Sequence, residues 1–266
     1  FQVYGALFSG QFEPALRAAN QMQATVRPEY LDAGHAFLVN HLEAFYGMKA
    51  HVLIRFGKWQ AILDEPLPED PTLFCVTHAF WQYAKGIAHA VLGNIDEALK
   101  QQRLLRAAVT ALPAERIVFQ NDSRDILAVA EAMLAGELEY RRENYDLAFA
   151  HLREAVDLYD SLNYSEPWSW MMPPRHALGA LLLEQGHVND AASVYRADLG
   201  LDDTLVRPSQ HPNNIWSLLG YAECCERLDD SKTLEVILPE LAKAQQVADS
   251  SIAVSCFCRT THECCD

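Results

Sequence analysis

The sequence lacks several features that mark large classes of proteins. No basic-then-apolar leader is visible, and no apolar run reaches the ~18 residues that a membrane-spanning helix needs. Lys and Arg number only 21 against 36 Asp and Glu, which gives a formal charge of −15. A surface this acidic repels phosphate backbones and anionic lipids, and no local basic patch offsets it. We therefore expect neither a nucleic acid nor a membrane as a partner.

Cysteine is too irregularly placed to form a disulfide framework. The seven Cys are odd in number and unevenly spread, whereas disulfide-stapled domains carry regularly spaced pairs. A reducing compartment is the simpler interpretation, so we expect a cytoplasmic protein. The chain begins at Phe1 rather than Met, and we expect it to be the later part of a longer protein.

Sequence signatures of catalysis are also missing. The chain has no G-x-S-x-G, no H-E-x-x-H, no P-loop and no Rossmann fingerprint. Carboxylates are plentiful, but no pair of them lies in an obviously apolar setting. An enzyme is therefore not the favoured class, although a repeat array can assemble a site from distant segments.

What the sequence does contain is a spaced pattern of small residues. Gly179, Gly186 and Ala191 follow one another at +7 and +5, and Gly86, Gly93 and Ala98 repeat that spacing. This is the pattern of a tetratricopeptide (TPR) unit, in which two antiparallel helices bury each other's small-residue face. Gly179 allows a close helix crossing, and Ala191 is expected to fit against it, with Tyr195 filling the gap one turn later.

The pattern predicts an all-α, TPR-like α-solenoid of about six helix pairs over residues 1–250, followed by a Cys-rich segment, 251–266. The first helices of successive pairs, expected at 80–92, 126–137, 175–185 and 216–227, would line a concave face. In the fourth pair the reversing residue is predicted to be Asn144, which tolerates the left-handed conformation. Two long loops, 160–174 and 198–212, interrupt the array, and loops of this length often carry function.

Several stretches are more specific than the repeat pattern. The stretches that resemble a family of large TPR-containing proteins from bacteria and fungi are HVLIRFGKWQAIL (51–63), DILAVAEAMLAGELEYRRENYDLAFAHLREAV (125–156), EPWSWMMPPRHALGALLLEQG (166–186), HPNNIWSLLGYAEC (211–224) and SCFCR (255–259). The resemblance extends over nearly the whole chain and implies an α-solenoid with a further helical half upstream, but no established activity. Members of that family commonly carry His where this chain has Leu219 and Ala222, so a site built on those two His would be lost or altered.

The loops supply candidate ligand-binding residues. Residues 166–176 concentrate two Trp, two Met, an Arg and a His, which fits either a recognition loop or a loop that its Trp side chains fasten to the array. His176 and His211 each begin a first helix just after a long loop, so adjacent pairs could bring them together. The candidate ligand-binding residues are Trp168, Trp170, Arg175, His176, His211, Asn214 and Trp216.

The tail is the sharpest chemical signal in the chain. Cys256, Cys258, His262, Cys264 and Cys265 fall within ten residues. Two Cys at i,i+2 of extended backbone point to one side and could chelate Cu or Zn, and redox-active or buried thiols are the alternative. Residues 252–258 are too apolar for a free tail, so we expect them to pack near Trp216 or the 198–212 loop, with mobile residues from Thr260 onward.

Two functions follow from these observations. The favoured one is an interaction module that binds a peptide, a protein or a small ligand on its concave face and inter-repeat loops. The alternative is a metal-binding protein, or a metal-dependent enzyme, whose ligands are His176, His211, Cys256 and Cys258.

Overall fold

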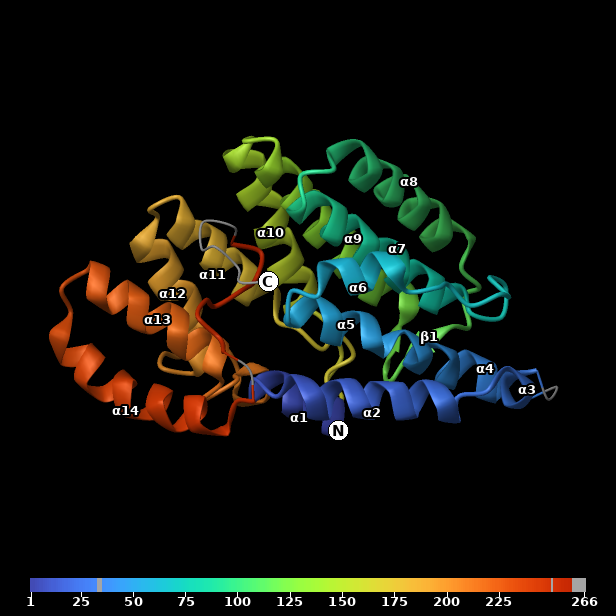
Figure 1. Cartoon of the computed structure of the whole chain (residues 1–266), viewed down its shortest axis with the longest axis horizontal. Helices are drawn as coiled ribbons and strands as arrows, with labels where there is room; N and C mark the ends of the chain where they lie inside the picture. Colours follow the sequence, from blue (N-terminus) through green and yellow to red (C-terminus); the bar gives the residue numbers. More distant parts are fainter. Residues whose placement is uncertain (33–34, 250, 260–266) are drawn as a thin grey trace.

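A computed structural model describes residues 1–32, 35–249 and 251–259 of the chain, and in that part the protein is all-α apart from one short hairpin (Figure 1). The elements are α1 (Gln2–Phe8), α2 (Phe12–Thr25), α3 (Pro28–Leu31), α4 (Ala36–Leu42), the 3-10 helix η1 (Glu43–Gly47), α5 (Met48–Arg55), α6 (Trp59–Asp64), α7 (Cys75–Val91), α8 (Ile95–Ala111), β1 (Ile117–Val118), β2 (Asn121–Asp122), α9 (Ser123–Arg141), α10 (Tyr145–Asp160), α11 (Pro174–Glu184), α12 (Val188–Leu199), the 3-10 helix η2 (Arg207–Ser209), α13 (Ile215–Arg227) and α14 (Ser231–Val247). The expectations for Thr260 onward, His262, Cys264 and Cys265 lie outside the described residues.

The long helices pack as consecutive pairs. Helix α7 packs on α8, α9 on α10, α11 on α12, and α13 on α14, while α7·α9, α10·α11 and α12·α13 join one pair to the next. The predicted all-α class is therefore confirmed. The two strands, which the sequence did not predict, pair antiparallel with Ile117 opposite Asp122. Among the described residues, none of the helices has both the length and the apolar character that crossing a bilayer requires.

Left-handed residues reverse the chain between the helices of a pair. Gly57, Gly93 and Gly186 take φ values of 62°, 79° and 78°, a conformation that costs glycine little. The prediction for the fourth pair is wrong by one residue, because Glu143 has φ 63° whereas Asn144 has φ −87° and is the N-cap of α10. The reversal comes earlier since α9 ends at Arg141.

Small residues at the helix crossings make room for one aromatic ring. A side chain on Gly179 or on Gly220 would overlap the ring of Tyr195, which is fully buried. Tyr195 on α12 therefore fills the space between α11 and α13. The close crossing expected at Gly179 is present, but Tyr195 rather than Ala191 is the residue that a side chain there would meet.

The two ends of the helical array meet. The indole Nε1 of Trp216 on α13 donates to the carbonyl of Leu7 on α1 at 2.8 Å. The Asp249 carboxylate accepts hydrogen bonds from the backbone N–H groups of Phe12 and Glu13 at 2.6 and 3.0 Å, which satisfies donors that the start of α2 leaves unpaired. Figure 1 accordingly places α1 and α2 beside α14.

The tail packs against the helices, as the sequence predicts. Ile252, Val254 and Cys258 are buried, and the ring of Phe257 lies 6.1 Å from that of Trp216. Farther along the tail, the Ser255 hydroxyl lies 2.6 Å from the hydroxyl of Tyr195. The segment from 251 to 259 is therefore part of the folded core.

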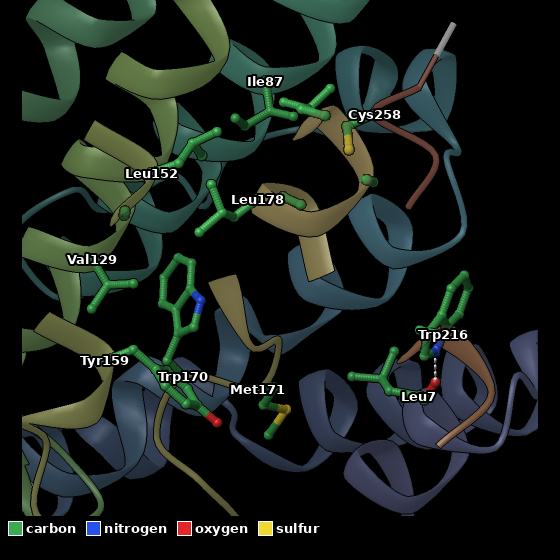
Figure 2. Close-up of a cluster of buried hydrophobic side chains, with 14 of the residues drawn as sticks. Leu7, Ile87, Val129, Leu152, Tyr159, Trp170, Met171, Leu178, Trp216 and Cys258 are labelled. Carbon is green, nitrogen blue, oxygen red and sulfur yellow. Dashed lines mark hydrogen bonds between the residues drawn. The ribbon is translucent and has the colours of Figure 1, made fainter. Parts of the chain in front are cut away.

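The loop before α11 also packs inward. Trp170 is fully buried and its ring lies 5.2 Å from that of Tyr83 on α7, and Figure 2 shows it in the buried cluster with Tyr159 and Leu178. Trp168 and Met171 are buried as well. This loop and the tail lie beside residues of α7, α9, α11 and α13, the helices predicted to line the concave face.

Candidate functional site: a buried carboxylate network beside a cleft

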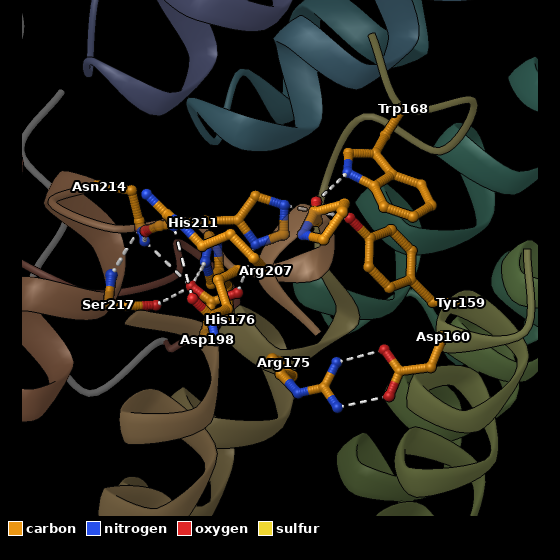
Figure 3. A network of polar contacts seen from close by, with 12 residues as sticks. Tyr159, Asp160, Trp168, Arg175, His176, Asp198, Arg207, His211, Asn214 and Ser217 are labelled. Carbon is orange, nitrogen blue, oxygen red and sulfur yellow. Dashed lines mark hydrogen bonds and ion pairs between the residues drawn. The ribbon is translucent and has the colours of Figure 1, made fainter. Parts of the chain in front are cut away.

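Asp198, in the last turn of α12, is the centre of a buried polar network (Figure 3). Its side chain is inaccessible to solvent. One carboxylate oxygen, Oδ1, accepts a hydrogen bond from His211 Nδ1 at 2.9 Å. The other, Oδ2, accepts from His176 Nε2 at 2.9 Å, from Asn214 Nδ2 at 3.0 Å and from Ser217 Oγ at 2.6 Å. Four side chains from three segments thus satisfy one carboxylate.

The partners of His176 fix its tautomer. Arg55 Nη2 lies 2.9 Å from His176 Nδ1, and because a guanidinium only donates, Nδ1 must accept. The hydrogen of His176 is therefore on Nε2, which donates to Asp198. His211 Nδ1 donates to Asp198, and its Nε2 lies 3.4 Å from the Tyr159 hydroxyl.

Burial and neighbouring charges together set the protonation states of His176 and Asp198. Burial lowers the pKa of His176 to about 4, aided by the Arg55 guanidinium and opposed by Asp198. Burial would raise the pKa of Asp198, but His176 and His211 hold it well below its usual range. The network therefore contains an ionised carboxylate, a neutral His176 and a guanidinium, Arg55, that balances the buried negative charge.

The local chain path explains how Asp198 and His211 meet. Gly200 ends α12 with φ 69°, and the chain returns so that the His211 N–H donates to the Asp198 carbonyl at 2.6 Å. Asn214 then caps α13 by accepting a hydrogen bond from the Ser217 N–H at 2.9 Å. The 198–212 loop thus begins at Asp198 and returns to it, because His211 near its end bonds to both the side chain and the carbonyl of Asp198.

Aromatic side chains from both ends of the chain pack against the network. The ring of Phe8 on α1 stacks on His211, with centroids 4.8 Å apart and planes 15° apart. The Arg55 guanidinium lies over the ring of Trp216 at 4.6 Å, a contact that stabilises a buried cation. Segments separated by most of the chain therefore converge on Asp198.

A cleft of about 530 Å³ lies next to this network, between α1, the end of the 198–212 loop and α14. His211 and Asn214 belong both to the network and to the cleft wall. The other lining residues are Tyr4, Phe8, Ser9, Gln210, Pro212, Asn213, Glu240, Lys243, Ala244 and Val247.

The remaining predicted ligand-binding residues have packing roles in this structure. Trp168 Nε1 donates to the Pro208 carbonyl at 3.3 Å, which joins the two long loops. Arg175 forms a two-pronged ion pair with Asp160, with both N–O distances 2.6 Å. Trp170 and Trp216 are fully buried. For residues 166–173, fastening of the loop to the array describes the structure better than an open recognition loop.

A much smaller cavity, of about 40 Å³, is lined by His176 together with Arg55, Trp170 and Cys256. Within the described part of the chain, Arg55 Nε and Trp170 Nε1 are buried without a hydrogen-bond partner. A cavity of this volume with two donors has room for one water molecule.

The predicted metal ligands are brought together only in part. His176 and His211 share Asp198, His176 and Cys256 line one cavity, and Cys256 is joined to Cys258 by a disulfide. A single disulfide between residues two apart in the tail is not the disulfide framework that the spacing of the Cys argued against. Within residues 1–32, 35–249 and 251–259, no cluster of three or more His, Cys, Asp or Glu is arranged to hold a metal ion. Binding of Cu or Zn stays a prediction.

Sequence reasoning missed Asp198 and Arg55. One signal for Asp198 was available, because a carboxylate in the last turn of a helix opposes the helix dipole and needs compensation. No comparable signal marks Arg55, which lies 121 residues before His176 in the sequence.

No protein family, no curated protein and no solved structure matches this chain. The candidate site therefore rests on the geometry of the chain's own residues, and membership of a TPR family stays a prediction.

Proposed function

We propose that the protein is a TPR-like helical array that binds a small ligand, or the end of a peptide, in the cleft beside His211. The observation that carries the proposal is the meeting of a cleft of about 530 Å³ with a buried hydrogen-bond network at His211 and Asn214. Ligand pockets typically have volumes of about 300–1,000 Å³ and combine apolar walls with a few fixed polar groups.

Two features of the chain support the TPR-like part of the proposal. The Gly–Gly–Ala spacing recurs at Gly86 and Gly179, and consecutive helix pairs pack on one another from α7 to α14. TPR arrays bury the small-residue face of each pair against its neighbours, and Tyr195, enclosed between Gly179 and Gly220, is consistent with such packing.

The lining of the cleft indicates the chemistry of its ligand. Tyr4, Phe8 and Val247 supply apolar wall. The two charged residues, Glu240 and Lys243, form an ion pair with an N–O distance of 2.7 Å, so they offset each other. A net charge of −15 disfavours anions. The cleft therefore suits an uncharged or weakly basic amphipathic molecule better than a phosphate or a dicarboxylate.

The polar groups of the cleft are held in place before a ligand arrives. Asn213, between His211 and Asn214, has φ 61°, and such a conformation in a non-glycine residue persists only where its surroundings impose it. Asp198 holds the side chains of His211 and Asn214, which precede and follow Asn213 in the chain. Preorganised groups lower the entropy cost of binding.

Ligand-observed NMR with a library of small amphipathic molecules and short peptides tests the proposal. Ala244 is partly buried in the cleft wall, so Ala244→Trp fills the cleft. Ala242→Trp on the same helix is the matched control, because Ala242 is exposed and does not line the cleft.

We expect compounds that bind the wild type and the Ala242→Trp variant and lose binding to the Ala244→Trp variant. Compounds that bind all three proteins equally would place binding elsewhere. A library without any compound that depends on Ala244 would overturn the proposal.

A further inference from the structure

The disulfide between Cys256 and Cys258 closes a loop of only three residues. A disulfide stabilises a fold mainly by restricting the unfolded chain, and the effect grows with the length of the closed loop. This disulfide therefore contributes little to stability. The tail is held in other ways, through the contact of Ser255 with Tyr195 and the ion pair of Arg259 with Glu223 at 2.6 Å.

The two sulfur atoms differ in accessibility. Cys256 is partly exposed, whereas Cys258 is buried with 4% of its surface accessible. An external thiolate can therefore reach the sulfur of Cys256 more easily than that of Cys258. Cys224 and Cys225 are buried inside α13, and burial raises the pKa of Cys224 to about 12, so these thiols are expected to be inert.

The surroundings of Cys256 favour a thiolate once the disulfide opens. The backbone N–H of Cys258 donates to Cys256 Sγ at 3.2 Å, a hydrogen bond that is stronger to a thiolate than to a disulfide sulfur. Arg141 donates to the Cys258 carbonyl, and Arg55 lines the same small cavity as Cys256. Cations near a cysteine favour its reactive, ionised form.

We propose that Cys256 and Cys258 form a thiol–disulfide exchange site that reacts with small thiols and disulfides of the glutathione type. In the reductive direction, a thiolate attacks Cys256 Sγ, the bond to Cys258 breaks, and Cys258 leaves with the electron pair and takes a proton from water. A second thiolate attacks the external sulfur of the mixed disulfide and releases Cys256 as the thiolate. Two small thiols become one disulfide, and two electrons pass to the protein. Neither Cys256 nor Cys258 lines the cleft beside His211.

Equilibration in glutathione buffers tests whether the Cys256–Cys258 pair interconverts between disulfide and dithiol. The full chain carrying Cys264→Ser and Cys265→Ser is incubated without oxygen at a series of ratios of reduced to oxidised glutathione, quenched with acid, alkylated and digested. As the proportion of reduced glutathione rises across the series, we expect the peptide with Cys256 and Cys258 to change from disulfide to dithiol in one two-electron step. Cys224 and Cys225 should stay thiols throughout. A pair that stays dithiol in oxidised glutathione, or stays disulfide in reduced glutathione, would overturn the proposal.

Two single variants in the same background test which sulfur reacts. Cys258→Ser leaves the accessible Cys256, which we expect to form a mixed disulfide with oxidised glutathione on the order of tenfold faster than Cys258 does in the Cys256→Ser variant. Circular dichroism melts verify that both variants are folded. Equal rates, or a faster reaction at Cys258, would contradict the assignment of the attacked sulfur.

The same preparation separates exchange from metal binding. Reduced protein is incubated with zinc or with copper(I), passed through gel filtration and then treated with oxidised glutathione. If it retains one equivalent of metal and does not react, the pair is a metal site and the exchange proposal fails. If it reacts and releases the metal, exchange is supported.

Discussion

The Trp216 indole donates to the Leu7 carbonyl at 2.8 Å across 209 residues of sequence. Both residues are buried. This bond joins the first helix to the last pair of the array, and the cleft lies between the elements that it brings together. The proposed binding site therefore depends on this contact between the first helix and the last helix pair as much as on the residues that line the cleft.

Trp216→Phe removes the donor and keeps most of the apolar ring. We expect a loss of unfolding free energy of about 1–3 kcal/mol, because a buried carbonyl loses a hydrogen bond and the Arg55 guanidinium loses part of its aromatic contact. Urea unfolding followed by circular dichroism measures the change. Trp59→Phe serves as the control, since Trp59 is only partly buried; a loss as large at Trp59 would mean that ring size, not closure, explains the effect.

Asp198→Asn tests the carboxylate network. The amide keeps the shape of the side chain but removes the charge that balances Arg55 and replaces an acceptor with a donor. We expect a loss of about 3–5 kcal/mol, as is usual when one member of a buried charge pair is removed. Asp203→Asn is the matched control, because Asp203 is exposed and should change stability by less than about 0.5 kcal/mol. Similar values for the two variants would show that the network is not important for stability.

Acidification should weaken the fold through His176. Its pKa is lowered from 6.5 to about 4, so between these values the unfolded chain binds more protons and stability falls as the pH falls. The full contribution is present above pH 6.5. His51, whose pKa burial lowers to about 3, acts in the same sense, whereas Glu43, whose pKa burial raises to about 7, acts in the opposite sense.

Comparison of the wild type with His176→Gln isolates the contribution of His176. We expect the difference in unfolding free energy between the two proteins to shrink by about 2 kcal/mol from pH 7.5 to pH 5, in favour of the variant. Urea titrations at the two pH values measure it. A difference that does not depend on pH would mean that His176 is not held neutral in the fold.

Gly179→Ala tests the helix crossing at Tyr195. A Cβ at Gly179 would overlap the Tyr195 ring, so we expect a loss of roughly 1–3 kcal/mol. Gly5→Ala in α1 is the matched control, because nothing lies within 4 Å of a Cβ there; alanine should be neutral or stabilise by up to ~1 kcal/mol. Thermal melts compare the two. A variant at Gly179 as stable as the wild type would contradict the packing described here.

The sequence was informative where structure is decided locally. The long helices, the two long loops and the reversals at Gly57, Gly93 and Gly186 follow from residues close to one another in the chain. The apolar run at 252–258 also indicated correctly that the tail packs against the fold. The error at Asn144 amounts to one residue, because several residue types can take the reversing position.

The candidate site was predictable only in part. The expectation that His176 and His211 approach one another followed from their equivalent places in adjacent pairs. The residues that hold them, Asp198 and Arg55, come from a helix end and from a helix 121 residues away from His176, and no spacing rule links them. The inward packing of Trp170 was equally beyond local reasoning, because an aromatic loop can cover either the fold or a ligand.

The most direct test of the account is a ¹H–¹⁵N shift map of the wild type with a compound that binds through Ala244. The account predicts perturbed amide signals for Ser9, Asn213 and Val247, three lining residues that come from the three sides of the cleft. Gly93, far along the array in the α7–α8 turn, should not shift. Perturbations that cluster on α7 and α8 and leave Ser9, Asn213 and Val247 unchanged would contradict the assignment of the cleft as the binding site.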